Sequence, residues 1–169
     1  MTTVIEIAQR AKSASQILRT VSGKAREKAL NAMADKLLTY HDEVIAANNA
    51  DLEAAPDLTP AFRKRLQVTP KIFDYMLNRL REAAALPDPV GKILEGHTMP
   101  SGLQVRKTAV PIGVIAMIYE ARPNVTTDAA AVAIKSGNAV ILKGGSDSLR
   151  TNLVLAKAMR EAAVEAGLP

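Results

Sequence analysis

Two continuous apolar runs of strand length constrain the fold of this chain more than any other feature. The first covers residues 113–119 and the second residues 139–142, with an apolar helical pattern between them. A strand that is apolar at nearly every position is typical of a parallel sheet covered on both faces. Strand, helix and strand within about thirty residues predict a βαβ unit with a right-handed crossover. The chain is therefore expected to be an α/β protein.

The residues that follow the second run predict where a ligand would bind. Lys143 stands at the carboxyl end of that strand, where ligands of open α/β sheets bind. Residues 143–148 then open a last helix, and glycines beside a helix N-terminus favour anions because free N–H groups and the helix dipole act together. No Gly-x-Gly-x-x-Gly or Walker loop occurs, so a flexible turn stays open as the alternative. Gly137 is expected to end the preceding helix in a left-handed conformation.

Residues 1–90 have the period of amphipathic helices, with apolar positions at steps of three and four. One stripe runs from Val4 to Val21 and ends at Gly23. A second stripe runs from Leu30 to Ile45, and the pair Asn48-Asn49 is expected to end it. These stripes predict two long helices.

Proline marks the next boundaries. Thr59-Pro60 and Thr69-Pro70 each join a capping hydroxyl to a residue tolerated at the first helical position, so each pair predicts a helix start. The second of these helices should end before residues 86–89, which contain two prolines. Residues 91–108 change to short extended pieces around the turn Pro100-Ser101-Gly102, which predicts a β-hairpin. One face of the hairpin should be solvated, and the other should cover something or pair with another chain.

These patterns divide the chain into three parts. We expect a helical region over residues 1–90, a protruding hairpin over residues 91–110 and the first βαβα of a Rossmann-like parallel sheet over residues 111–169. A parallel sheet of two strands leaves an open edge and cannot cover both faces of its apolar strands. The chain by itself is therefore expected to be poorly stable or prone to association.

The composition excludes several kinds of site. The chain has no cysteine, so disulfides, zinc–thiolate centres, iron–sulfur clusters and a catalytic thiol are impossible within it. His41 and His97 have no neighbours at ligand spacing, and we expect no metal site. The net charge is +5, yet aromatic residues are only 3% and the basic cluster at 63–65 fits a solvated helix face, which argues against nucleic-acid binding. No apolar run is long enough for a membrane span, and we expect a soluble cytoplasmic protein.

Three strings in the second half of the chain resemble one enzyme family. They are Pro111-Ile112-Gly113-Val114, Tyr119-Glu120-Ala121-Arg122-Pro123-Asn124-Val125-Thr126 and Ser136-Gly137-Asn138-Ala139-Val140. With residues 86–91 added, the chain resembles the N-terminal portion of the gamma-glutamyl phosphate reductases (glutamate-5-semialdehyde dehydrogenases) of the aldehyde dehydrogenase superfamily. The resemblance spans essentially the whole chain and implies an aldehyde dehydrogenase-like fold.

The resemblance also implies an activity. The family reduces gamma-glutamyl phosphate to glutamate-5-semialdehyde with NADPH and releases phosphate, as a step of proline biosynthesis. Its mechanism uses a cysteine thiolate that forms a thioester, which hydride from the nicotinamide then reduces. Family members are more than twice as long and this chain has no cysteine, so we expect an inactive N-terminal fragment of a homo-oligomeric enzyme. The hairpin would belong to the oligomerisation element.

The resemblance assigns the cofactor to the loop after the second strand. Lys143 matches the superfamily lysine that reaches the adenosine ribose, and its charge suits the 2′-phosphate of NADP(H). Ser146 stands where NAD-preferring relatives often carry a glutamate, so no carboxylate at that position repels a 2′-phosphate. With Gly145 between them, these residues are the expected cofactor-binding set. A solvated strand-end lysine is the alternative for Lys143.

The loop after the first strand is the expected substrate side. Asn124 resembles the asparagine whose amide helps form the superfamily's oxyanion hole, and its alternative role is that of a helix cap. Arg122 is placed to receive the phosphate or carboxylate of the substrate in bidentate fashion. Its alternative role is a structural pair with Glu120.

Two other classes stay open at this point. Another acyl-activating reductase of the superfamily would share the fold, although the string at 119–126 argues against it. A non-catalytic binding module would also explain a basic chain without a nucleophile. A nucleic-acid binder would show steeply salt-dependent association, which we do not expect.

Overall fold

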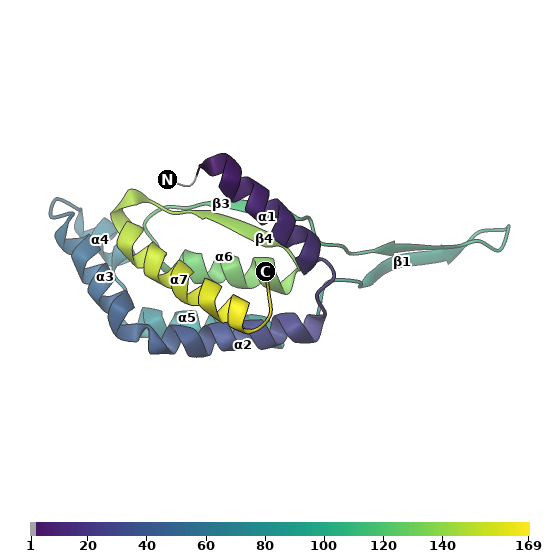
Figure 1. The fold of residues 1–169 in the computed structure, drawn as a ribbon, viewed down its shortest axis with the longest axis horizontal. Helices are drawn as coiled ribbons and strands as arrows, with labels where there is room; N and C mark the ends of the chain where they lie inside the picture. Colours follow the sequence, from purple (N-terminus) through teal and green to yellow (C-terminus); the bar gives the residue numbers. More distant parts are fainter. Residues whose placement is uncertain (1–2) are drawn as a thin grey trace.

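The computed structural model describes residues 3–169, and its elements confirm the α/β class (Figure 1). In chain order they are α1 (Val4–Leu18), α2 (Gly23–Thr39), α3 (His41–Glu53), α4 (Pro60–Leu66), α5 (Pro70–Ala85), β1 (Ile93–Thr98), β2 (Gln104–Thr108), β3 (Val114–Ile118), α6 (Asn124–Lys135), β4 (Ala139–Lys143), the short 3-10 helix η1 (Ser146–Ser148) and α7 (Leu149–Glu165).

The predicted strand–helix–strand unit is present as β3, α6 and β4. The two strands pair in parallel. Figure 1 shows α1 on one face of the strands and α6 on the other, with α7 beside α6 and with α2 and α5 as the outermost layer. One hydrophobic core runs through these layers, and Leu30, Met33 and Leu155 within it are at most 1% exposed. The helical region and the strands therefore form one packed body.

The second long helix predicted from the stripe between Leu30 and Ile45 is wrong, because that stripe belongs to two helices. The helical ladder breaks at Tyr40, whose N–H donates to the carbonyl of Leu37, three residues back, at 3.0 Å. α3 begins immediately afterwards, with Asp42 and Glu43 in its first turn. Carboxylates at a helix N-terminus are stabilised by the helix dipole, so these residues favour a new start.

The prediction that Asn48-Asn49 ends this region is also wrong, because α3 continues to Glu53. Asn48 is 1% exposed. Its amide Nδ2 donates to the carbonyl of Leu66 at 2.9 Å, and its Oδ1 accepts from the N–H of Val68 at 2.8 Å. Because these tertiary bonds satisfy the amide, it does not compete with the helix backbone.

Both helix starts predicted from threonine and proline are confirmed. Thr59 and Thr69 are the N-caps of α4 and α5. Their hydroxyls accept from the N–H groups of Phe62 and Ile72, each at 3.3 Å. The prolines occupy the first turn of each helix, where a missing N–H leaves no bond unmade. α5 ends at Ala85, before the two prolines that were expected to stop it.

The predicted hairpin is present and projects away from the packed body (Figure 1). β1 and β2 pair antiparallel, and the turn closes through a bond from the Gly102 N–H to the Met99 carbonyl at 2.8 Å. Every residue of both strands is exposed. Within residues 3–169 the apolar side chains of Leu94 and Val105 are therefore uncovered, so the hairpin covers nothing in this part of the chain.

The expectation that the strands are buried on both faces is wrong for the residues described. Met117 is 37% exposed and Ile118 is 77% exposed. The reason is that residues 3–169 give β3 one neighbouring strand only, which is β4. The open edge expected of a two-stranded sheet is thus confirmed. Gly137 has φ +75°, as predicted for the residue that ends α6.

A buried arginine joins the base of the hairpin to the packed body. Arg26 of α2 is 2% exposed, and its Nη2 donates to both carboxylate oxygens of Asp88, at 3.0 and 2.8 Å. Its Nη1 donates to the carbonyl of Lys135, at the end of α6, at 2.8 Å. The guanidinium therefore ties the segment before β1 to two helices at once.

Candidate active-site edge

Two loops meet at the carboxyl edge of the parallel strands. Because β3 and β4 run in the same direction, the β3–α6 loop (residues 119–123) and the β4–α7 loop (residues 144–148) leave the sheet at one end. The Tyr119 N–H donates to the carbonyl of Lys143 at 3.0 Å. A Cβ on Gly145 would lie 3.7 Å from the nearest backbone atom of the β3–α6 loop. The structure thus brings the predicted cofactor and substrate loops together.

The predicted cofactor-binding residues lie on the β4–α7 side of this edge. Lys143 and Ser146 are exposed, and Gly145 is partly buried between them. No hydrogen bond or ion pair joins the Lys143 ammonium to another of residues 3–169. The edge therefore presents a free cation and a free hydroxyl three positions apart. Such a pair fits a phosphate and a ribose hydroxyl at the adenosine end of a dinucleotide.

The predicted substrate residue Arg122 lies on the other loop and is exposed, as is Glu120. None of the ion pairs among residues 3–169 joins the two, so the alternative of a structural pair is wrong. The carbonyl of Arg122 accepts from the Val125 N–H at 3.0 Å. This bond anchors the backbone at Arg122 and leaves the guanidinium free to bind an anion.

Asn124 is the first residue of α6, and its alternative role as a helix cap is wrong. The N-cap position is Pro123, and no side chain caps the helix. The Asn124 Nδ2 instead donates to Oδ2 of Asp128, one turn further on, at 3.0 Å. Burial raises the pKa of Asp128, although the bond from Asn124 and the charge of Arg79 act in the opposite direction. The Asn124 amide is thereby held in one orientation at the edge.

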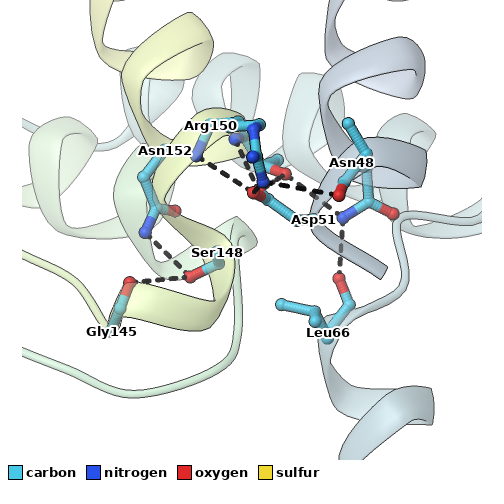
Figure 2. A network of polar contacts seen from close by, with 9 residues as sticks. Asn48, Asp51, Leu66, Gly145, Ser148, Arg150 and Asn152 are labelled. Atoms are coloured by element: carbon cyan, nitrogen blue, oxygen red, sulfur yellow. Dashed lines mark hydrogen bonds and ion pairs between the residues drawn. The ribbon is translucent and has the colours of Figure 1, made fainter. Parts of the chain in front are cut away.

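The prediction that the last helix offers a free N-terminus to an anion is wrong, because Asp51 of α3 occupies it (Figure 2). The buried Asp51 carboxylate accepts from the N–H groups of Arg150 and Thr151, at 3.3 and 2.8 Å, and from the Thr151 hydroxyl at 2.7 Å. The short helix η1 also lies between the glycines of the β4–α7 loop and the first residue of α7. A ligand anion beside the β4–α7 loop would therefore depend on Lys143 and not on the N-terminus of α7.

Four polar side chains link the two loops behind the edge. The hydroxyls of Tyr119 and Thr126 are 2.6 Å apart, and Thr126 donates to Oδ1 of Asn152 at 3.0 Å. Nδ2 of Asn152 donates to the Ser148 hydroxyl at 2.9 Å, which Figure 2 shows beside Gly145. Thr126, Ser148 and Asn152 are at most 8% exposed. Burial raises the pKa of Tyr119, so its hydroxyl keeps its proton.

Sequence reasoning missed Asp51, Thr126 and Asn152. Asn152 carried a usable signal, because it lies three residues before Leu155 on the buried face of α7. A polar residue on the buried face of a helix must find a hydrogen-bond partner, so its position indicates a tertiary bond. One partner of Asn152 is Thr126 of α6, and the helical period of α7 does not reveal which element supplies it.

Residues 3–169 contain no group of three histidine, aspartate or glutamate side chains arranged to hold a metal ion. In the same part of the chain, none of the helices combines the length and the hydropathy needed to cross a bilayer.

Comparison with known proteins defines the class. The family described as "Aldehyde dehydrogenase family" matches residues 1–169. The chain therefore belongs to the aldehyde dehydrogenase family.

Within that family the chain is similar to gamma-glutamyl phosphate reductases. It is 45% identical over 171 residues to the gamma-glutamyl phosphate reductase of Xylella fastidiosa strain M23, an alignment that covers 100% of this chain and 40% of that protein. The crystal structure of the Thermotoga maritima gamma-glutamyl phosphate reductase matches with a TM-score of 0.94 at 35% identity, over 98% of this chain and 40% of that one. The crystal structure of the Saccharomyces cerevisiae gamma-glutamyl phosphate reductase also matches with a TM-score of 0.94, at 34% identity, over 100% of this chain and 45% of that one. The expected fold is thus confirmed. The chain spans about 40% of the length of the curated relatives it matches, at their N-terminal end.

Proposed function

We propose that this chain provides the N-terminal, cofactor-binding portion of a cytoplasmic gamma-glutamyl phosphate reductase. The reaction is the NADPH-dependent reduction of gamma-glutamyl phosphate to glutamate-5-semialdehyde with release of phosphate, in proline biosynthesis. The observation that carries the proposal is the 45% identity to such a reductase over the whole chain. The exposed Lys143 and Ser146 at one edge support it, because they offer a cation and no carboxylate at these two positions.

Each exposed residue of the edge has a separate part in the proposal. Lys143 binds the 2′-phosphate of NADPH, and the Ser146 hydroxyl and the Gly145 backbone contact the adenosine ribose. Arg122 binds the phosphate or carboxylate of the acyl phosphate in bidentate fashion. The Asn124 amide stabilises negative charge on the acyl oxygen, with one N–H held by Asp128 and the other free.

NADPH would supply the hydride, and these 169 residues supply positioning and charge. They contain no cysteine, so the thiolate that attacks the acyl phosphate is not among them. What the residues present do is bind two anionic molecules side by side at the carboxyl edge. Holding reactants in a fixed geometry lowers the barrier before any bond changes.

A binding titration tests the cofactor part of the proposal. We expect the 169-residue chain to bind NADPH more tightly than NADH, because Lys143 pairs with the 2′-phosphate. The Lys143→Ala variant should remove that preference, whereas Lys28→Ala, a change at an exposed position of α2 in the outermost layer, should leave it unchanged. Equal affinities for the two nucleotides in the parent chain would overturn the NADPH assignment.

A chimera tests the reaction. This chain would replace the matching segment of the Xylella fastidiosa reductase, with which it is 45% identical. We expect a folded chimera to reduce gamma-glutamyl phosphate, and Arg122→Ala within it to raise the KM for the acyl phosphate. A chimera with the thermal stability of the parent enzyme but no reductase activity would refute the proposed function.

The hairpin suggests how the protein would assemble. We propose that residues 91–110 form an oligomerisation element, between a helical region at 1–90 and the first βαβα of the cofactor-binding domain at 111–169. The support is that both faces of the hairpin are exposed, including Ile93, Leu94 and Leu103 at 53–62%. Sedimentation velocity should show a homo-oligomer whose dissociation constant rises when Leu94 and Leu103 are both replaced by serine.

A further inference from the structure

The four polar side chains behind the edge join two loops that the sheet alone would connect only through backbone bonds. They are Tyr119, Thr126, Asn152 and Ser148, and we call them the loop clamp. Tyr119 follows β3, Thr126 lies in the first turn of α6, and Asn152 lies in the first turn of α7. The loop clamp therefore connects elements that are up to 33 positions apart in the sequence.

The direction of each hydrogen bond in the loop clamp follows from the donors available. A threonine hydroxyl has one proton, and Thr126 donates it to Oδ1 of Asn152. Tyr119 must therefore donate its own proton to Thr126, across 2.6 Å. On the other side, Asn152 donates to Ser148 at 2.9 Å and Ser148 donates to the carbonyl of Gly145 at 3.5 Å (Figure 2). One continuous series of donors and acceptors runs between the two loops.

The hydrogen bonds of the loop clamp can form because residue 144 is a glycine and has no side chain. A Cβ on Gly144 would overlap the amide nitrogen of Asn152 and would lie 3.1 Å from the Tyr119 hydroxyl. The Asn152 amide is bonded at both of its ends, so it cannot move aside without losing a bond. The glycine that follows Lys143 is therefore required by packing behind the edge.

We propose that Thr126 and Asn152 are positioning residues that hold the β3–α6 and β4–α7 loops at a fixed separation. This inference rests on the proposed function for the identity of the ligands. Neither residue is exposed at the edge, and both act through the backbone of loops that carry Arg122 on one side and Ser146 on the other. Because they are joined by the loop clamp, movement of one loop is transmitted to the other.

One substitution and its matched control isolate the loop clamp. Thr126→Val replaces the hydroxyl by a methyl group of similar size, and Thr126→Ser restores the hydroxyl. Thr127→Val is the control, because Thr127 is in the same helix, is 0% exposed and donates only to the Asn124 carbonyl within α6, at 2.8 Å. Gly144→Ala is a second test, since it keeps every hydrogen-bonding side chain and displaces Asn152.

Amide hydrogen exchange of the 169-residue chain measures the coupling without any ligand. The reporters are the Tyr119 N–H, bonded to Lys143, and the Leu149 N–H, bonded to Ser146. We expect Thr126→Val and Gly144→Ala to speed exchange at both reporters by about fivefold to tenfold, the effect of losing about one buried hydrogen bond. Thr126→Ser should restore slow exchange. An unchanged Leu149 in Thr126→Val, or equal acceleration in Thr127→Val, would overturn the inference.

Kinetics of the chimera then show whether the coupling positions ligands. We expect Thr126→Val to raise the KM for NADPH and for the acyl phosphate several-fold while kcat changes less than twofold, with Thr127→Val near the parent. Unchanged KM values alongside faster loop exchange would refute a positioning role. An inactive parent chimera would refute the proposed function instead, and the exchange data would still decide whether the loops are coupled.

Discussion

Residues 3–169 form two sheets of two strands each, and these sheets differ in the contacts that stabilise them. The β1–β2 hairpin is antiparallel, joins neighbours in the sequence and exposes every residue. The β3–β4 pair is parallel, lies between α1 and α6, and is continued behind its carboxyl edge by the buried loop clamp. The pairing of the first sheet is set by a local turn, whereas the second sheet depends on packing between segments that are distant in the sequence. We therefore expect the hairpin to contribute little to the free energy of unfolding, which should come mainly from the packed body.

The largest difference between the packed body and the hairpin should appear when a core side chain is removed and the free energy of unfolding is measured. Leu155 of α7 is 0% exposed within the core. Leu155→Ala should lower the free energy of unfolding by about 3 kcal/mol, through lost burial and the cavity left behind. The matched change Leu103→Ala in the hairpin, at a residue 62% exposed, should change it by less than about 0.5 kcal/mol. Urea unfolding followed by circular dichroism measures both, and equal losses would contradict the division.

The sequence predicts the local half of this comparison well. The turn at Pro100-Ser101-Gly102 and the two capping threonines are readable because each depends on neighbours within four residues. The parallel pair is also readable, from its apolar runs and from the family resemblance. The division of one long apolar stripe into α2 and α3 cannot be predicted from the sequence, because the apolar spacing from Leu37 to Val44 suits a continuous helix equally well.

The candidate site divides in the same way. The positions of Lys143 and Ser146 after a strand predict an exposed loop, and the structure exposes both side chains. The occupant of the α7 N-terminus is Asp51, about a hundred residues earlier, and nothing local to either segment indicates that contact. Contacts between distant segments are set by how the helices pack, which periodicity alone leaves undetermined.

The junction between the hairpin and the body should give the next largest effect. Arg26→Met removes three hydrogen bonds and leaves Asp88, which is 35% exposed, without its partner. We expect a loss of about 2–3 kcal/mol in the free energy of unfolding. Arg81→Met is the control, because its pair with Asp35 is exposed and should contribute less than about 1 kcal/mol. A loss from Arg26→Met no larger than the control would show that the junction is not a stabilising contact.

A change in the hairpin turn should remain confined to the hairpin. Gly102 has φ +85° and no atom within 4 Å of a Cβ placed on it, so Gly102→Ala adds backbone strain of about 1 kcal/mol without a clash. Gly96→Ala is the matched control, since its Cβ would make only ordinary contacts. Exchange of hairpin amides should speed up in Gly102→Ala alone. Faster exchange in α2 or α7 as well would show that the hairpin shares the stability of the body.

The smallest effect should be a pH-dependent one in the body. Burial raises the pKa of Asp128, so its charged form is disfavoured in the folded state. This cost is fully present above the raised pKa and diminishes as the pH falls through it, because the folded state then binds a proton more readily than the unfolded state. Asp128→Asn removes the cost and keeps an oxygen that can accept from Asn124. It should therefore raise Tm at pH 7 by more than at pH 4.

The hairpin supplies the control for that measurement. Glu95 is exposed and lies 3.4 Å from Lys107, an arrangement that contributes little to stability in water. Glu95→Gln should leave Tm nearly unchanged at both pH values, because water solvates that carboxylate whether or not the hairpin is formed. If Glu95→Gln matched Asp128→Asn in size and pH dependence, general charge repulsion in a basic chain would explain both. A response from Asp128 alone would locate the effect in the burial that separates the packed body from the hairpin.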